Sequence, residues 1–215
     1  MTTTLRARAT IAAIIATAAL LSACASKGPS NANYDFGPLP PPTQAAGANN
    51  VGAIIVADAT GPASLDTERM HYRLLYADAR QSRPYAYNQW TSTPLQLITQ
   101  RMKARIAQAG VKVLSTTDSA ASVNLLRLEV DDFAQNFEAA TQSSGQISLR
   151  ASVFRSHRLV DQKTFTRSAQ APSADAAGGA RALADAADAL AADILVWLNG
   201  LPPTPPTPAM PAPQK

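Results

Sequence analysis

The sequence has few of the residues that build catalytic and metal centres. It contains one cysteine, two histidines and 16% charged residues over 215 positions. A single cysteine excludes a disulfide within the chain and a metal site built from several thiolates. The two histidines, His71 and His157, belong to no HExxH-type pair or other ligand spacing. We therefore predict no catalytic residue, no metal and no cofactor, and we predict that the protein is not an enzyme.

Adjacent carboxylates are the strongest remaining sign of chemistry. Asp131 and Asp132 follow one another in a predicted strand, with Glu138 further along the chain. Neighbouring residues on a strand point to opposite faces, so the two aspartates cannot act together as an acid–base pair unless a bulge interrupts the strand. The sequence also contains no GxSxG motif and no phosphate-binding glycine loop.

Positive charge is also scarce. The chain has 19 Lys and Arg against 15 Asp and Glu, a formal net charge of +4. Arg6 and Arg8 lie in a segment that we expect to be cleaved, and without them the basic residues fall to 17, which leaves a mature charge near +2. No basic stripe with interleaved aromatic residues is present, so we exclude a nucleic-acid partner.

The first 23 residues have the pattern of a bacterial lipoprotein signal peptide. Arg6 and Arg8 form the positive n-region, residues 11–21 form the apolar h-region, and Leu-Ser-Ala-Cys ends the segment at Cys24. This ending fits the lipobox, in which cleavage leaves the cysteine first and its sulfur carries diacylglycerol. The alternative is an uncleaved membrane anchor, but a membrane span needs roughly 20 apolar residues. We predict a signal peptide over 1–23 and lipidation of Cys24.

The residues after Cys24 predict where the anchored protein resides. Ala25 and Ser26 follow the cysteine, and in the enterobacterial sorting scheme the absence of an aspartate there directs a lipoprotein outward. We therefore expect the periplasmic face of the outer membrane, with the inner membrane as the alternative. The acyl chains are the expected membrane contact, at roughly 0.8 kcal/mol per buried methylene group.

Composition divides the mature chain into three parts. Residues 24–50 are rich in Gly, Pro, Ser, Asn and Ala, which predicts a flexible tether. Residues 51–201 carry the periodic apolar patterns of a folded domain, and residues 202–215 form a proline-rich tail that we expect to be disordered. Within the tether, Tyr34 and Phe36 either dock on the domain or remain loose.

A strand pair followed by a helix is the organising unit of the domain. Residues 70–76 and 83–90 alternate in polarity as half-buried strands do, and the polar residues 78–82 join them as a hairpin. Thr93 is then placed to cap a helix that ends at Gly110.

The rest of the pattern predicts further strands and a final helix. Residues 51–57 form a continuous apolar run typical of a buried central strand. Alternating runs predict the remaining strands, at 123–133, 147–153 and 159–169. The stretch 142–145 is expected to be a turn, and the alanine-rich stretch 175–198 predicts a helix. These elements predict an α+β fold, a two-layer sandwich with two amphipathic helices on one face of a mostly antiparallel sheet.

Aromatic residues make up only 6% of the chain, and three of them stand close together in the second strand of the hairpin. Tyr85 and Tyr87 share a predicted strand face, and Trp90 lies on the other. Aromatic residues are frequent anchors of protein interfaces. We therefore predict that Tyr85, Tyr87 and Trp90 contact a partner. The alternative is that they are core aromatic residues of a small sheet.

Three stretches resemble one known family. The lipobox followed by Tyr-Asp-Phe-Gly-Pro at 34–38 is similar to the opening of the ABC-type transport auxiliary lipoproteins. Residues 85–94, with a helix beginning at the proline, resemble the most recognisable stretch of that family, and residues 128–133 resemble a later strand. The Ser-Thr before Pro94 and the proline-rich tail depart from the family's pattern.

The resemblance implies a non-catalytic role in transport. Such lipoproteins accompany an ABC permease, its ATPase and a periplasmic MCE-domain protein, and they move lipid or another hydrophobic solute between the inner and outer membranes. The resemblance therefore implies that the permease, the ATPase and the MCE-domain protein are partners of this chain. The membrane is a further expected contact, made through acyl chains on Cys24. We also consider that the chain forms a homo-oligomer. Two alternatives stay open: a stand-alone envelope lipoprotein that binds a small ligand or the cell wall, and a periplasmic hydrolase.

Overall fold

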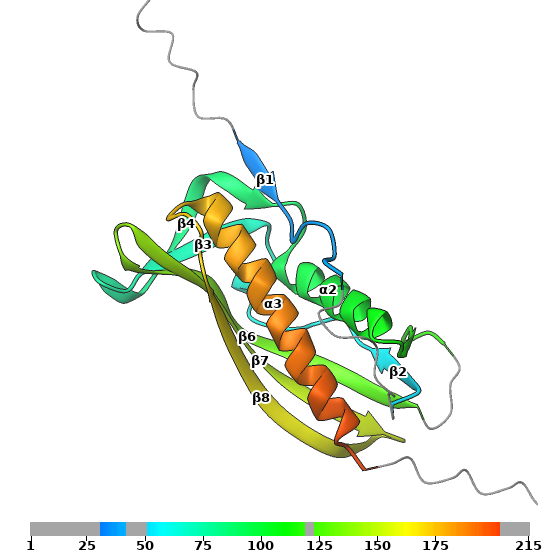
Figure 1. Cartoon of the computed structure of the whole chain (residues 1–215). Helices are drawn as coiled ribbons and strands as arrows, with labels where there is room; N and C mark the ends of the chain where they lie inside the picture. Colours follow the sequence, from blue (N-terminus) through cyan, green and yellow to red (C-terminus); the bar gives the residue numbers. More distant parts are fainter. Residues whose placement is uncertain (1–30, 42–50, 119–122, 203–215) are drawn as a thin grey trace, which may run out of the picture. The chain divides into compact units, whose positions relative to one another are not determined.

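The computed structural model describes residues 31–41, 51–118 and 123–202 of the chain. Its strands are β1 (Ala32–Tyr34), β2 (Ala53–Val56), β3 (Arg69–Leu74), β4 (Asp78–Trp90), β5 (Lys112–Leu114), β6 (Asn124–Ala139), β7 (Gln142–Arg155) and β8 (Arg158–Gln170). Its helices are α2 (Pro94–Gln108), α3 (Ala176–Asn199) and the short 3-10 helix η2 (Ala63–Leu65). The predicted α+β fold is confirmed, because the strands form one mixed, mostly antiparallel 8-stranded sheet on which both α-helices pack (Figure 1).

The long strand β6 holds the sheet together. On one edge it pairs antiparallel with β7 along nearly its whole length, and β7 pairs in turn with β8. On its other edge it pairs parallel with β2 near its beginning and with β3 near its end. β2 also pairs with β5, and β3 is followed outward by β4 and β1. The predicted central strand is therefore confirmed as β2, which is paired on both edges.

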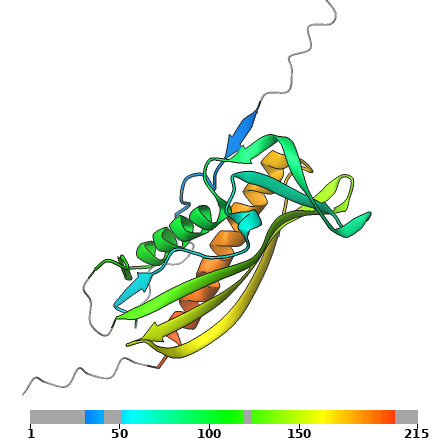
Figure 2. The same cartoon turned by 180° about the vertical axis from the view of Figure 1, so that it is seen from behind.

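Both α-helices lie on one face of the sheet, as the sequence predicted (Figures 1 and 2). On β6, Leu126, Leu128 and Val130 are buried, whereas the alternate residues Arg127 and Glu129 are exposed on the opposite face. α3 packs on β7 and β8 and also against α2. The apolar face of the sheet and the two helices thus enclose one core, which stabilises the fold by roughly 25 cal/mol per Å² of buried apolar surface.

Side chains cap both α-helices at their first turn. Thr93 Oγ1 accepts a hydrogen bond from the Gln96 amide at 3.4 Å, which confirms the predicted N-cap. Asp175 Oδ1 accepts a hydrogen bond from the Gly178 amide at 2.8 Å, and this bond lowers the pKa of the Asp175 carboxyl. α2 stops before Gly110, whose φ of 87° favours glycine. Local sequence therefore sets where each helix begins, and where α2 ends.

Two predicted turns lie inside strands instead. The hairpin turns at residues 75–77, and residues 78–82 already belong to β4. In the same way, residues 142–145 form the beginning of β7, which follows directly on β6. Residues 78–82 are exposed to solvent, whereas Ser143 and Ser144 are buried and their hydroxyl groups are hydrogen bonded to Gln135 and Glu138. Polar residues are accommodated in both strands for these reasons.

Residues 32–41 belong to the domain, which corrects the expectation of a tether that continues to residue 50. β1 pairs parallel with the end of β4, and Phe36 is only 7% exposed within the core. Tyr34 also packs against the core, so both aromatic residues dock on the domain. The predicted signal peptide, the predicted tether up to residue 30, residues 42–50 and the tail beyond residue 202 lie outside the described residues.

Gly145 explains how closely α3 approaches the sheet. An atom at its Cβ position would lie 2.6 Å from the Leu183 amide nitrogen and 2.7 Å from the Ala182 carbonyl carbon, both in the backbone of α3. A glycine inside a strand often marks such a close approach of another backbone. Its role here is therefore packing rather than turn formation.

We predict that Gly145→Ala destabilises the domain by about 1–3 kcal/mol, because the added methyl group forces α3 away from β7. Gly200→Ala is the matched control, since an atom at its Cβ would have its nearest neighbour at 3.4 Å and its φ of −85° suits any residue. The control should change stability by less than about 0.5 kcal/mol. Urea unfolding measures both variants. Equal stability of the two would show that α3 can shift without loss of packing.

Candidate interaction surface

Tyr85 is held against the sheet by stacking and by a hydrogen bond. Its ring lies 4.7 Å from that of Tyr72, centroid to centroid, and the Tyr72 ring lies 5.7 Å from that of Phe137 on β6. The Tyr85 hydroxyl donates to Gln135 Oε1 at 2.8 Å. Burial, followed by the nearby Tyr72 hydroxyl, raises the pKa of Tyr85 well above its usual value of 10. Tyr85 therefore stays neutral at physiological pH and serves the packing of the hairpin.

Gln135 connects the hairpin to the start of α3. Its side chain is fully buried, at 0% exposure. Besides accepting from Tyr85, the amide donates from Nε2 to Ser143 Oγ at 2.8 Å and to the Asp175 carbonyl oxygen at 3.0 Å. Each polar atom of this buried amide has a partner, and the partners come from β4, β7 and the N-cap of α3. One side chain thus fixes three elements relative to β6.

The structure separates the three aromatic residues that the sequence singled out. Trp90 is 1% exposed and its ring lies 5.9 Å from that of Phe36 and 5.5 Å from that of Phe133, so it is a core residue. Tyr85 is half-buried, as described above. Tyr87 is 50% exposed. Contact with a partner therefore stays a prediction, and Tyr87 is the residue with a ring free to make it.

The irregular register of β4 explains why the predicted faces were wrong. Arg69 pairs with Gln89, but His71 pairs with Pro84, so the pairing of β3 and β4 shifts strongly between these residues. Strict alternation holds only where pairing is regular, and an irregularity re-aims side chains. Tyr85 and Tyr87 therefore differ in burial although they are two positions apart.

Two arginines of α2 attach the segment after β1 to both helices. Arg101 donates to the Phe36 carbonyl oxygen at 2.7 Å, and Arg105 donates to the Pro40 carbonyl oxygen at 3.0 Å. Both arginines meet Asp188 of α3. Arg105 binds both carboxylate oxygens, at 2.8 and 2.6 Å, and Arg101 Nε lies 3.0 Å from Oδ1 in an ion pair that lacks hydrogen-bond geometry.

The Asp188 carboxylate partly neutralises the positive charge of the two guanidinium groups. Burial lowers the pKa of Arg101, whereas the hydrogen bond that Arg105 donates to Asp188 raises the pKa of Arg105. Both guanidinium groups stay charged at neutral pH, because arginine is not deprotonated in proteins. Sequence reasoning missed the cluster, because no local pattern pairs Asp188 of α3 with Arg101 and Arg105 of α2.

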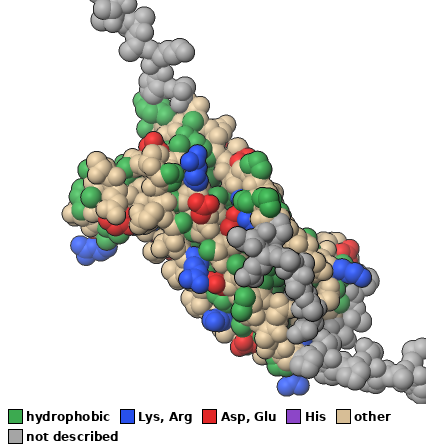
Figure 3. All heavy atoms as spheres, viewed as in Figure 1, with side chains coloured by type: hydrophobic (Ala, Val, Ile, Leu, Met, Phe, Trp, Pro, Cys, Tyr) green, Lys and Arg blue, Asp and Glu red, His purple; other side chains and the backbone are tan. Residues whose placement is uncertain are grey.

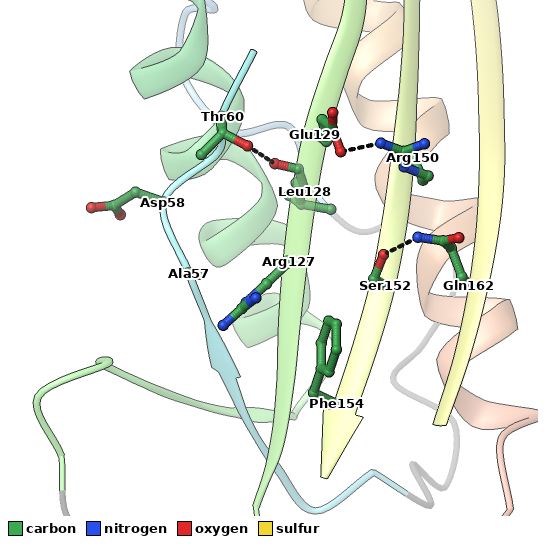
Figure 4. A pocket seen from close by; sticks show the side chains of 10 residues that line it. All are labelled: Ala57, Asp58, Thr60, Arg127, Leu128, Glu129, Arg150, Ser152, Phe154 and Gln162. Carbon is green, nitrogen blue, oxygen red and sulfur yellow. Dashed lines mark hydrogen bonds and ion pairs between the residues drawn. The ribbon is translucent and has the colours of Figure 1, made fainter. Parts of the chain in front are cut away.

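The open face of the sheet has a shallow groove of about 430 Å³. In Figure 4 the Arg127 guanidinium lies next to the Phe154 ring, at 4.8 Å from its centroid, and an ion pair joins Glu129 to Arg150. Ser152 and Gln162 hydrogen bond across β7 and β8 at 2.8 Å. Most of the residues that line the groove are polar or charged and several of them are paired with one another, so the groove offers contact surface rather than reactive groups.

Charge and metal ligands are dispersed over the parts of the chain that the structure describes. Figure 3 shows acidic and basic side chains interspersed on the face in view. Over residues 31–41, 51–118 and 123–202, no three His, Cys, Asp or Glu side chains gather as metal ligands do. No helix within the same ranges is long and apolar enough to cross a membrane. Asp131 stands at a bulge in β6, and its neighbour Asp132 is bound by Arg73 at 2.8 Å.

Solved structures share this fold. Protein XCC0632 from Xanthomonas campestris, of the family DUF330, superposes with a TM-score of 0.60 at 19% identity and covers 70% of this chain and 86% of its own. A second structure, of an uncharacterised protein, gives 0.64 at 16% identity and covers 79% and 99%. None of the curated proteins searched matches the chain. The class is thus an α+β domain with a DUF330-like structure.

The chain belongs to the ABC-type transport auxiliary lipoprotein component family, whose model matches residues 34–195. This match confirms the resemblance found in the sequence. Its range begins at Tyr34, in agreement with the docking of β1 and Phe36 on the domain. The protein is therefore an auxiliary lipoprotein component of an ABC-type transport system. Cys24, the predicted lipidation site, lies outside the described residues.

We predict that Asp188→Ala lowers the free energy of unfolding by about 2–4 kcal/mol, because it leaves two largely buried guanidinium groups without their anion. The Asp188 side chain is 16% exposed, which places the loss near the lower end of the range for buried pairs. Asp193→Ala is the control, since its partner Arg167 is 49% exposed and solvent screens that pair. Thermal unfolding of both variants checks this. If the two substitutions lowered the unfolding temperature equally, the result would contradict a structural role for the cluster of Arg101, Arg105 and Asp188.

Proposed function

We propose that the protein is a lipid-anchored, non-catalytic component of an MCE-associated ABC transport system that moves lipid or another hydrophobic solute between the inner and outer membranes. The observation that carries this proposal is the family match over 34–195 directly after a lipobox that ends at Cys24. The proposed partners are the MCE-domain protein, the permease and the ATPase of the same system. The proposed location is the periplasmic face of the outer membrane.

In this role the domain is a rigid platform rather than a carrier of solute. Its core is filled by side chains of the sheet and both helices, and the grooves among the described residues are shallow and open. A solute-binding cavity would instead be concave and mostly apolar. The exposed ring of Tyr87 on β4 is the proposed point of contact with the MCE-domain protein.

We predict that Cys24 carries the acyl chains. Metabolic labelling with a fatty acid should tag the wild-type chain and leave Cys24→Ser without label, because the chain contains no second cysteine. Mass spectrometry of the N-terminal peptide gives an independent reading. Equal labelling of the two chains would remove the lipid anchor from the proposal.

We predict that Tyr87→Ala weakens capture of the MCE-domain protein while the stability of the domain is retained. Loss of an exposed aromatic anchor at an interface costs about 1–2 kcal/mol, roughly a tenfold loss of affinity. Leu159→Ala is the control, because Leu159 is exposed to a similar degree, 54% against 50%, at a different place on the sheet. Co-purification from membranes measures the affinity. Unchanged capture by Tyr87→Ala would exclude this contact, whereas failure of the wild type to retrieve any component would contradict the proposed system.

A further inference from the structure

We infer that the β3–β4 turn rests in the surface of the membrane that holds the lipid anchor, with Leu75 and Tyr76 placed among the lipid headgroups. This inference rests on the lipid anchor of the proposed function. It concerns a second membrane contact, made by the folded domain itself.

The turn exposes two adjacent hydrophobic side chains. Leu75 is 40% exposed and Tyr76 is 54% exposed. Large apolar side chains scattered singly over a surface need no explanation, but a neighbouring pair at the tip of a hairpin does. Tyrosine favours the boundary between membrane and water, where its ring is in apolar surroundings and its hydroxyl in polar ones. The pair therefore suits a membrane surface better than open solvent.

The neighbouring turn widens the same contact. The Leu75 amide donates to the Phe137 carbonyl oxygen at 2.9 Å, which holds the turn between β6 and β7 beside it. That second turn consists of Ala140 and Thr141, which carry no charge, and Ala139 precedes it at the end of β6. Figure 1 shows both turns at one end of the sheet. The end thus presents a small, uncharged and partly apolar surface.

Cationic side chains border this surface. The Arg80 side chain is 94% exposed, and its carboxylate partner Asp78 lies at 3.5 Å in solvent. Arg83 lies further along β4, and its side chain donates a hydrogen bond to the neutral side chain of Gln81 at 2.9 Å. Basic residues beside an apolar tip favour anionic lipid headgroups. The acidic residue near the second turn, Glu138, accepts a hydrogen bond from Ser144 at 2.6 Å.

Only a short stretch of sequence separates the proposed anchor at Cys24 from the domain. β4 runs from the turn at Asp78 toward Trp90, and β1 runs parallel beside its last residues, with Ala32 opposite Asn88. Because the two strands are parallel, Ala32 is the residue of β1 whose partner lies nearest to the start of β4. Eight residues lead from Cys24 to Ala32. Fully extended, they span at most roughly 28 Å.

The opposite end of the sheet provides an internal reference. The β7–β8 turn lies at the other end of β7 from the β6–β7 turn, and a strand of 14 residues is roughly 45 Å long. Leu159 follows that turn and is 54% exposed, the same as Tyr76. If exposure alone drew side chains to the membrane, Leu159 would behave as Tyr76 does. If orientation decides, only Tyr76 reaches the lipid.

Depth-dependent fluorescence quenching in proteoliposomes tests the inference. The full lipidated chain carries Tyr76→Cys or Leu159→Cys, each labelled with an environment-sensitive fluorophore, because acylation leaves no other free thiol. The vesicles contain phosphatidylethanolamine, phosphatidylglycerol and a phospholipid with brominated acyl chains. The probe at residue 76 should be quenched at least about threefold more strongly than the probe at residue 159, because bromine lies within the hydrocarbon core of roughly 30 Å. Circular dichroism verifies that both labelled chains are folded.

Mass spectrometry of Cys24 separates failure of the anchor from failure of the turn. Acyl chains on Cys24 together with strong quenching at residue 76 alone support the inference. Acyl chains together with equal or absent quenching overturn it, leave the anchor intact and indicate a protein partner for the turn. A chain without acyl groups that fails to join the vesicles overturns both proposals.

Discussion

The close approach of α3 to β6 and β7 is the constraint on which the rest of the domain depends. Gly145 leaves space for the α3 backbone, and an atom at the Cβ of Gly179 would lie 2.0 Å from Gln135 Oε1. α3 buries many small residues, among them Ala180, Ala184, Ala187 and Ala191. A buried amide without partners costs roughly 1–3 kcal/mol, so Gln135 is tolerated only when β4, β7 and α3 are all in place. The close packing of α3 on the sheet and the hydrogen bonds of Gln135 therefore require the same arrangement of β4, β6, β7 and α3.

Once α3 is placed, it determines how the chain enters the domain. Asp188 holds Arg101 and Arg105, and these hold the carbonyl groups of Phe36 and Pro40. The Phe36 ring fills the core beside Trp90. Residues 36–40 are therefore attached to the domain by several contacts, one of them the buried bond from Arg101.

Much of the fold could be predicted because its signals are local. Thr93, the apolar run of β2 and the alternation of Leu126, Leu128 and Val130 identify a cap, a central strand and a buried face without knowledge of distant contacts. The contact of Arg105 with Asp188 joins residues 83 positions apart, and no local pattern encodes it. For the candidate site, the lipobox at Cys24 and the family resemblance could be found, but the burial of Trp90 and the exposure of Tyr87 could not. They follow from the register shift between β3 and β4, which only the folded pairing reveals.

That register shift also bears on function, because it allows one strand to serve several purposes. Trp90 at the end of β4 is buried in the core, Tyr87 three residues earlier is exposed, and β4 begins at the exposed turn that carries Tyr76. A regular strand would place alternate residues on one face along its whole length. In the proposed orientation, the turn meets the lipid, Tyr87 faces a protein partner and Trp90 secures the strand to the core. The hairpin can then connect membrane and partner rigidly, because its other aromatic residues are stacked on Phe137 and hydrogen bonded to Gln135.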